Sequence, residues 1–171
     1  ATPIGDYDAA VISGDIIQGV GLGNTNSDAE LKGQYEIAHE FLAELASRFF
    51  SGDRSRIIVV PGNHDIDWNT ARKSMELVNK PDAPIRKLLT TPNSLFRWDW
   101  ESKQLYAIKD RALYERRFDH YHEFHRGFYK ATTAPVYSDP KGYFDLFELC
   151  GDKHQFRALF LAHTMQRTGT L

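Results

Sequence analysis

The chain has 171 residues, of which 42% are hydrophobic and 26% charged, a composition typical of a folded globular domain rather than a disordered chain. Its formal net charge of -2 provides no overall attraction for nucleic acid or an anionic membrane. The single cysteine, Cys150, excludes an intrachain disulfide, and neither an export signal nor an apolar run of about 18 residues occurs. We therefore expect one soluble, cytoplasmic domain without a membrane partner.

The first predicted elements are a strand and a long helix. Residues 9–13 form a short apolar run that stops at Gly14, which is typical of a buried strand. A glycine-rich loop at 19–26 follows, and Ser27 and Glu30 then have the spacing of a capping box. The helix should end near residues 51–53. Apolar residues at three- and four-residue steps predict its buried face: Ala38, Phe41, Leu42, Leu45 and Phe49.

A second buried strand is predicted at 57–60, where four consecutive β-forming residues are stopped by Pro61. Strand, helix and strand make a βαβ unit, whose crossover should be right-handed and whose strands should be parallel. Because the carboxyl ends of parallel strands lie at the same edge of a sheet, we expect Asp15 to lie together with Asn63 and His64 there.

The remainder of the chain has a weaker pattern. A short helix is expected within 68–80, and a loop-rich stretch follows, with prolines at 81, 84 and 92. A longer helix is predicted over 108–130. Strands are predicted at 143–149 and 158–162, joined by a turn at 151–153 and continuing the first sheet. The predicted fold class is therefore α/β, with a mixed sheet.

The two strand ends carry residues suited to hydrolysis of a phosphate ester. Two metal ions about 4 Å apart clamp the phosphate and lower the pKa of a bridging water, so that a bridging hydroxide attacks phosphorus. Asp15 can bridge two cations, Asn63 can offer an amide oxygen, and His64 can donate a proton or stabilise the transition state. Oxygen and imidazole ligands favour Mn, with Fe, Zn or Mg as alternatives.

Two short motifs at these strand ends resemble a known family. Gly14-Asp15 follows the first strand, and VPGNHD at 60–65 follows the second, one crossover helix later. Together they resemble the calcineurin-like metallophosphoesterases, whose signature includes GD and GNH followed by Asp or Glu. The resemblance covers residues 9–66 well and the rest loosely. Gly-Asp and Gly-Asn turns are also common after strands without any function. In that case, however, both turns would have to match the pattern of one site by coincidence.

The resemblance implies an α/β fold in which a mixed β-sandwich with a βαβ core is flanked by helices. It implies a single metallophosphoesterase-like domain over 1–171, to which we add an aromatic-rich helical insertion or cap at about 92–132. It also implies two divalent metal ions, with Asp15 and Asn63 among the ligands, and we take His64 and Asp65 as the catalytic residues. We expect a phosphate-ester hydrolase that leans to phosphodiesters such as nucleotides or nucleic acid.

The sequence also departs from the family pattern. The family's opening D-x-H motif is absent before Gly14, and thirteen residues are too few for its strand and helix, so we expect further residues outside this sequence. Gln18 stands where many members have Asp. Near the closing G-H-x-H motif, Met165 replaces a ligand histidine, and His163 is either a metal ligand, as we predict, or a satisfied histidine at a strand end. An alternative function is a non-catalytic phosphoesterase-like binding or regulatory module of a larger protein.

Other candidate residues have structural interpretations that we prefer. His120 and His122 face different sides of a helix, so these two and His125 are predicted to be surface or packing residues rather than a metal cluster. The aromatic segment 96–129 is predicted to be core or cap, the alternative being a lid that stacks on a nucleobase. The metal, the natural substrate and the oligomeric state are left open.

Overall fold

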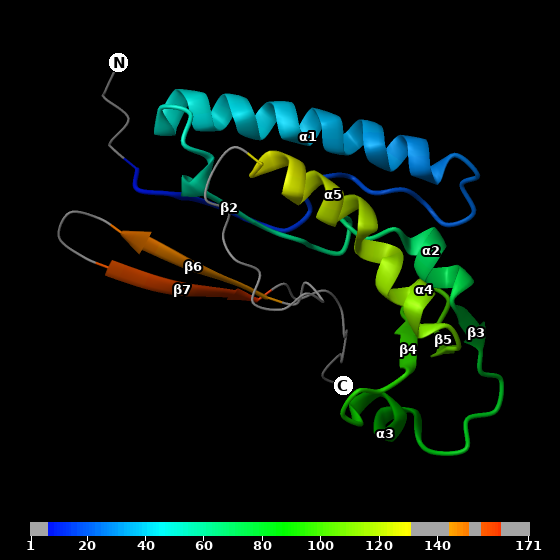
Figure 1. The fold of residues 1–171 in the computed structure, drawn as a ribbon. Coiled ribbons are helices and arrows are strands. Elements are labelled where there is room, and N and C mark those ends of the chain that lie inside the picture. The colour runs from blue at the N-terminus through cyan, green and yellow to red at the C-terminus, as the bar shows by residue number, and fades with distance from the viewer. Residues whose placement is uncertain (1–6, 131–143, 151–154, 162–171) are drawn as a thin grey trace.

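The computed structural model describes residues 7–130, 144–150 and 155–161, and it has the mixed α/β class that was predicted (Figure 1). The elements follow one another as β1 (Ala10–Ser13), α1 (Ser27–Phe50), the 3-10 turn η1 (Arg54–Arg56), β2 (Ile57–Val60), α2 (Trp68–Lys73), β3 (Met75–Leu77), α3 (Ile85–Thr90), β4 (Phe96–Asp99), β5 (Gln104–Ile108), α4 (Arg111–Glu115), the 3-10 turn η2 (Arg116–Phe118), α5 (Asp119–Phe128), β6 (Phe144–Cys150) and β7 (Gln155–Leu161). No helix in this described part of the chain combines the length and the apolar character needed to cross a bilayer.

The predicted βαβ unit is confirmed. β1 pairs with β2 in parallel, with Ala10 opposite Ile57 and Ser13 opposite Val60. All four residues of β2 are buried, as expected for a β-branched run covered on both faces. The two strands end at the same edge, so the loops that follow them start next to each other.

The buried face of α1 differs from the predicted one. Its buried residues are Leu31, Tyr35, Ala38, Leu42, Ala46 and Phe50. Phe41 and Phe49 were predicted on this face but are 54% and 42% exposed. The packing explains the rotation: α1 contacts both the strands and α5, and the small side chains of Ala38 and Ala46 allow this close approach. The larger phenylalanines lie on the flank.

The ends of α1 lie close to the predicted residues, but the capping box does not form. Asn26 is the N-cap residue and makes no side-chain cap hydrogen bond. Asn24 explains the difference, because its Nδ2 donates to Glu30 Oε1 at 3.0 Å and its Oδ1 accepts from Asn26 N at 2.7 Å. Glu30 therefore does not reach back to the helix start. At the other end Ser51 adopts the left-handed conformation and caps α1.

The helix α5 covers the edge of β2 that does not pair with β1. The hydroxyl of Tyr121 donates to the carbonyl of Val59 at 2.8 Å, and the hydroxyl of Tyr129 donates to the carbonyl of Ile57. These two tyrosines share one core with α1, together with Phe124 and Phe128. For these four side chains the preferred interpretation as core is confirmed.

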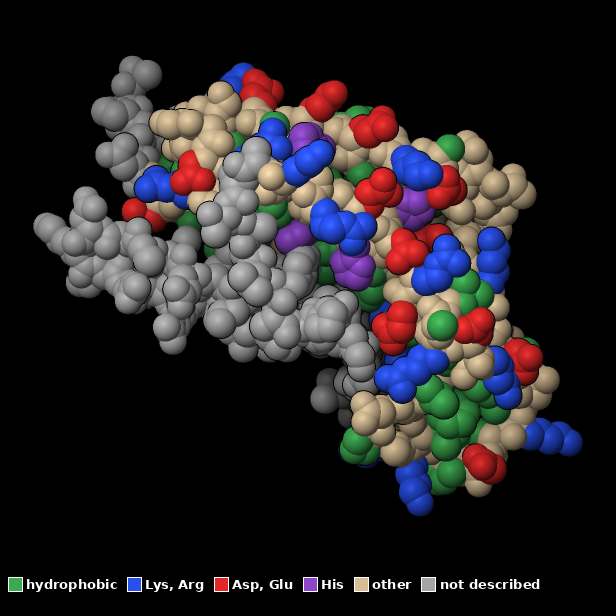
Figure 2. Space-filling model, viewed as in Figure 1, with side chains coloured by type: hydrophobic (Ala, Val, Ile, Leu, Met, Phe, Trp, Pro, Cys, Tyr) green, Lys and Arg blue, Asp and Glu red, His purple; other side chains and the backbone are tan. Residues whose placement is uncertain are grey.

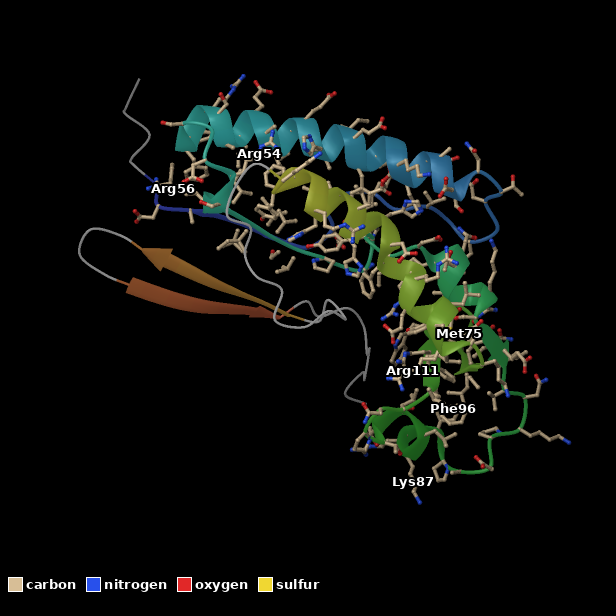
Figure 3. The ribbon with its side chains drawn as sticks, viewed as in Figure 1. Arg54, Arg56, Met75, Lys87, Phe96 and Arg111 are labelled. Atoms are coloured by element: carbon tan, nitrogen blue, oxygen red, sulfur yellow. The ribbon has the colours of Figure 1, made fainter. Side chains whose placement is uncertain are left out.

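A contact from η1 ties this core together. Arg54, labelled in Figure 3, lies beside the C-terminal end of α5. Its Nη1 donates to the carbonyl of Phe128 at 2.8 Å, and its guanidinium lies 5.1 Å from the centroid of the Phe128 ring. The turn before β2 is thereby anchored to α5 as well as to α1.

The helix predicted at 108–130 is confirmed over residues 111–128, but its start and its continuity were wrongly predicted. Residue 108 ends β5, and the helical part is divided into α4, η2 and α5. Asp110 begins α4 because its Oδ1 accepts from Leu113 N at 2.9 Å. The helix expected within 68–80 is shorter than predicted: it ends at Lys73, and Met75 already belongs to β3. Pairing of β3 with β5 therefore delays the start of the first of these helices and sets the end of the second.

The described strands form three separate sheets: β1-β2, the antiparallel β3-β5-β4 and the antiparallel β6-β7. The predicted continuation of the first sheet by the last two strands is therefore wrong. The two strands themselves are confirmed, and β6 contacts β2 without joining its ladder. The turn predicted at 151–153 lies outside the described residues.

Candidate functional site

The loops that follow β1 and β2 touch each other at the edge of the sheet. A Cβ atom added to Gly14, whose φ is +100°, would lie 2.8 Å from the Cα of Gly62. A Cβ atom added to Gly62 would lie 2.2 Å from Asp15 Oδ1. Only glycine allows this approach of the two backbones. The predicted proximity of Asp15 and His64 is confirmed, because Asp15 Oδ1 accepts a hydrogen bond from His64 N at 3.0 Å.

The buried side chain of Asp65 joins the two loops. Its Oδ2 accepts hydrogen bonds from Asp15 N at 2.8 Å and from Gly62 N at 2.7 Å. The side chain is buried, and burial raises the pKa of the carboxyl group while these backbone N–H groups lower it. Its Oδ1 is buried and accepts no hydrogen bond from the described residues. This placement favours a positioning role for Asp65 over direct contact with a substrate.

Among the predicted site residues that the structure describes, Asp15 and His64 remain at the surface. Asp15 has a φ of 55°, a left-handed conformation that aspartate tolerates in turns. One of its carboxylate oxygens accepts from His64 N, and the other, Oδ2, accepts no hydrogen bond from the described residues. The carboxylate is therefore oriented by its neighbour and still has an oxygen available for a ligand.

Asn63 directly precedes His64 in the loop after β2 and is half-buried. Its backbone carbonyl accepts from the indole Nε1 of Trp68 at 2.9 Å, while its amide side chain makes no hydrogen bond to the described residues. Trp68 is the first residue of α2, which Asp67 caps by accepting from the backbone N of Asn69 and Thr70. The segment between β2 and α2 is thus fixed at both ends.

Two residues that the sequence analysis missed hold the glycine-rich loop in place. Gln34 of α1 and Asn69 of α2 each form two hydrogen bonds with the backbone of residues 19–23. A carboxamide beside a glycine-rich loop is a weak signal in sequence, because the partner segment is known only once the helices are placed. The loop in turn contacts His64, whose Nδ1 is hydrogen-bonded to the carbonyl of Gln18.

The atoms at this edge are of the types that bind a divalent cation, but the described residues offer few of them. Asp15 and Asn63 provide the carboxylate and amide oxygens that hard cations bind. However, the described residues contain no group of three His, Cys, Asp or Glu side chains that could hold a metal ion. Catalytic zinc sites generally have three protein ligands. The third predicted ligand, His163, lies outside the described residues.

The histidines of α5 belong to no group of three His, Cys, Asp or Glu side chains among the described residues that could hold a metal ion. His125 is buried, and burial, with His122 and Arg126 nearby, lowers its pKa to about 3. The pKa of His122 is also lowered, mainly by burial. His120 instead lies 3.3 Å from the carboxylate of Asp28 on α1.

The surface charge is mixed. Figure 2 shows acidic and basic side chains interspersed over the face formed by α1, α5 and α4. Opposite charges that alternate in this way produce no extended field of one sign on that face. An anionic substrate would therefore have to be captured by local groups.

In comparisons with known proteins, no family model, no curated protein and no solved structure matches the chain. A function must therefore be argued from the geometry of the edge at β1 and β2.

Proposed function

We propose that the chain is a metal-dependent phosphoesterase whose hydrolytic site lies where the loops after β1 and β2 meet. The observation that carries the proposal is the hydrogen bond between the exposed residues Asp15 and His64 across two interlocked loops. Folding brings a carboxylate, an amide and an imidazole to one edge of a parallel strand pair, where ligands bind in open α/β sheets.

Each residue of the proposed site has a chemical role. Asp15 and Asn63 would hold a divalent cation, which neutralises charge on the phosphoryl oxygens and activates water. His64 would donate a proton to the leaving oxygen or stabilise the transition state. Asp65 would keep the two loops in contact. His163 remains a proposed additional ligand, and Mn²⁺ remains the first metal to test.

Phosphodiesters are the proposed substrates, nucleotides or nucleic acid among them. The support is the resemblance of residues 60–65 to the corresponding segment of metallophosphoesterases that act on diesters. The aromatic residues of α5 lend no support to this choice, because they are packed in the core. The comparison of a diester with a monoester therefore decides the substrate class.

A binding module without catalytic activity is the second candidate. Two features of the sequence favour it: Gln18 stands where a further carboxylate would be expected from the family resemblance, and Met165 stands where that resemblance would place a ligand histidine. Such a module would bind a phosphate-containing ligand at the same edge and release it unchanged.

The test is an assay of the 171-residue chain with Mn²⁺ against bis(p-nitrophenyl) phosphate, p-nitrophenyl phosphate and single-stranded DNA. His64→Ala should lower kcat by about 10²- to 10⁴-fold, the range for loss of a general acid. Asp15→Asn should weaken Mn²⁺ binding, measured by calorimetric titration. His120→Ala, which removes an imidazole from α5, is the matched control and should retain full activity.

The outcomes separate the two candidates. Hydrolysis that requires both Mn²⁺ and His64 supports the phosphoesterase. Binding of Mn²⁺ at fewer than two sites, without turnover of any of the three substrates, favours the binding module. Turnover that is the same in His64→Ala and in the unmodified chain would remove His64 from the mechanism.

A further inference from the structure

The glycine-rich loop after β1 is attached to α1 by one side chain. Gln34 Oε1 accepts from the backbone N of Gly19 at 3.0 Å, and Gln34 Nε2 donates to the carbonyl of the same residue at 3.1 Å. The carboxamide thus pairs with the backbone as a second peptide group would. This two-point contact fixes the position and the orientation of the Gly19 backbone.

A second carboxamide, on α2, holds the same loop near its other end. Asn69 of α2 is buried, its Oδ1 accepts from Gly23 N at 2.8 Å, and its Nδ2 donates to the carbonyl of Gly21 at 3.1 Å. The loop is consequently fastened to α1 near its beginning and to α2 near its end. Neither contact involves a charged group, so both persist across the pH range of ordinary assays.

The fastened loop lies against His64. A Cβ atom added to Gly19 would lie 2.8 Å from the carbonyl oxygen of His64, which shows how closely the two backbones approach. One residue earlier, the carbonyl of Gln18 is hydrogen-bonded to Nδ1 of the His64 ring. A carbonyl oxygen can only accept, so the proton of the neutral ring is on Nδ1. Nε2 then has a free lone pair.

We propose that Gln34 and Asn69 are positioning residues for His64. By holding the loop, they place the Gln18 carbonyl where it selects the Nδ1–H tautomer and orients the ring, so that Nε2 is the ring nitrogen presented to the substrate. The catalytic part of this inference rests on the function proposed above. The tautomer and the ring orientation do not depend on it.

The expected catalytic effect follows from the demand for orientation. A displacement of about 1 Å at a reacting group can lower a rate by roughly 10²-fold. Loss of one of two fastenings should displace the loop less, so each single variant, Gln34→Ala or Asn69→Ala, should lower kcat by about tenfold. KM should change by less than about threefold, because neither side chain contacts the substrate.

The primary measurement does not require activity. Ring ¹⁵N spectra of the metal-free chain at about pH 8, where free imidazole is neutral, report which nitrogen of His64 carries the proton. The unmodified chain should show the proton on Nδ1, and the two variants should show a mixture of tautomers. Glu36→Gln, at an exposed position two residues along α1 from Gln34, is the control and should leave the spectrum unchanged.

The experiment distinguishes failure of this inference from failure of the proposed function. A proton on Nε2 in the unmodified chain, or an unchanged tautomer in both variants, would overturn the positioning role whether or not the chain hydrolyses phosphate esters. A shifted tautomer with an inactive unmodified chain would keep the positioning role and reject the phosphoesterase. If buried Asn69 cannot be replaced without unfolding, Gln34→Ala alone decides.

Discussion

Two regions of the molecule use polar side chains in opposite ways. In the region around the β3-β5-β4 sheet, Arg72 lies 3.6 Å from the centroid of the Tyr106 ring. Tyr114 is contacted by two guanidiniums, those of Arg97 at 5.2 Å and Arg117 at 3.9 Å. Three arginines of this region thus lie over aromatic rings. Figure 3 marks its position by Met75, Phe96 and Arg111.

At the edge of β1 and β2, polar groups hold backbone in place and leave other polar groups exposed. Asp65 is buried and fastens two loops, whereas Asp15 and His64 remain at the surface. The difference teaches that a concentration of charge does not by itself identify a site. Arg72, Arg97 and Arg117 have their partners within their own region, while the edge has donors and acceptors still available for a ligand.

The largest predicted effect concerns His125, a buried residue of α5. His125 has a pKa of about 3 in the folded chain, chiefly because of burial, against 6.5 for an ordinary histidine. Between these values only the unfolded chain binds the proton, so the free energy of unfolding should fall as the pH falls from 6.5 towards 3. The full loss is about 4 to 5 kcal/mol, because each pH unit contributes about 1.4 kcal/mol.

Urea unfolding at several pH values measures this effect. His125→Phe should remove most of the acid sensitivity and retain the packing against Tyr129, whose ring centroid lies 4.6 Å from that of His125. An equal pH dependence in the variant and in the unmodified chain would assign the sensitivity to other groups.

The next largest effect should come from the residue that joins the two loops. Asp65→Ala removes the acceptor of two backbone N–H groups and should lower the free energy of unfolding by about 3 kcal/mol, since hydrogen bonds to a charged group contribute roughly 1.5 kcal/mol each. Asp65→Asn retains one oxygen and should cost less. A loss below about 1 kcal/mol for Asp65→Ala would show that the loops are held by other contacts.

The close approach of the loops after β1 and β2 predicts a smaller effect on the free energy of unfolding. Gly62→Ala places a methyl group where Asp15 Oδ1 lies, and it should cost about 1 to 3 kcal/mol and weaken Mn²⁺ binding. Gly33→Ala is the matched control, because Gly33 lies inside α1 and an added Cβ would meet no atom within 4 Å. The control should stabilise the chain by about 1 kcal/mol, as expected for alanine in a helix.

The smallest effect tests the other region. Arg97→Ala removes the contact with the Tyr114 ring and the hydrogen bond from Arg97 Nε to its hydroxyl, so unfolding should become easier by about 1 kcal/mol. Hydrolysis and Mn²⁺ binding should be unchanged. A tenfold loss of activity in a stable Arg97→Ala variant would place this region in the site and overturn the comparison.

The sequence predicted the part of the fold that depends on local patterns. The apolar runs that became β1 and β2, the helix between them and its end near Ser51 were correctly predicted. β1 was also predicted to be buried, but its residues alternate between half-buried and exposed. So was the proximity of Asp15 and His64, because strand order and crossover handedness leave few alternatives. The βαβ unit and the nature of its edge were therefore determined by sequence alone.

Only the tertiary structure decided the features that depend on which elements touch. Contact with α5 set the buried face of α1, which is why Phe41 and Phe49 are exposed. Pairing of β3 with β5 shortened one predicted helix and delayed the start of another. Gln34 and Asn69 became candidates only when their helices were seen beside the loop they hold. The physical reason is that such contacts join residues distant in sequence, and local periodicity contains no record of the partner.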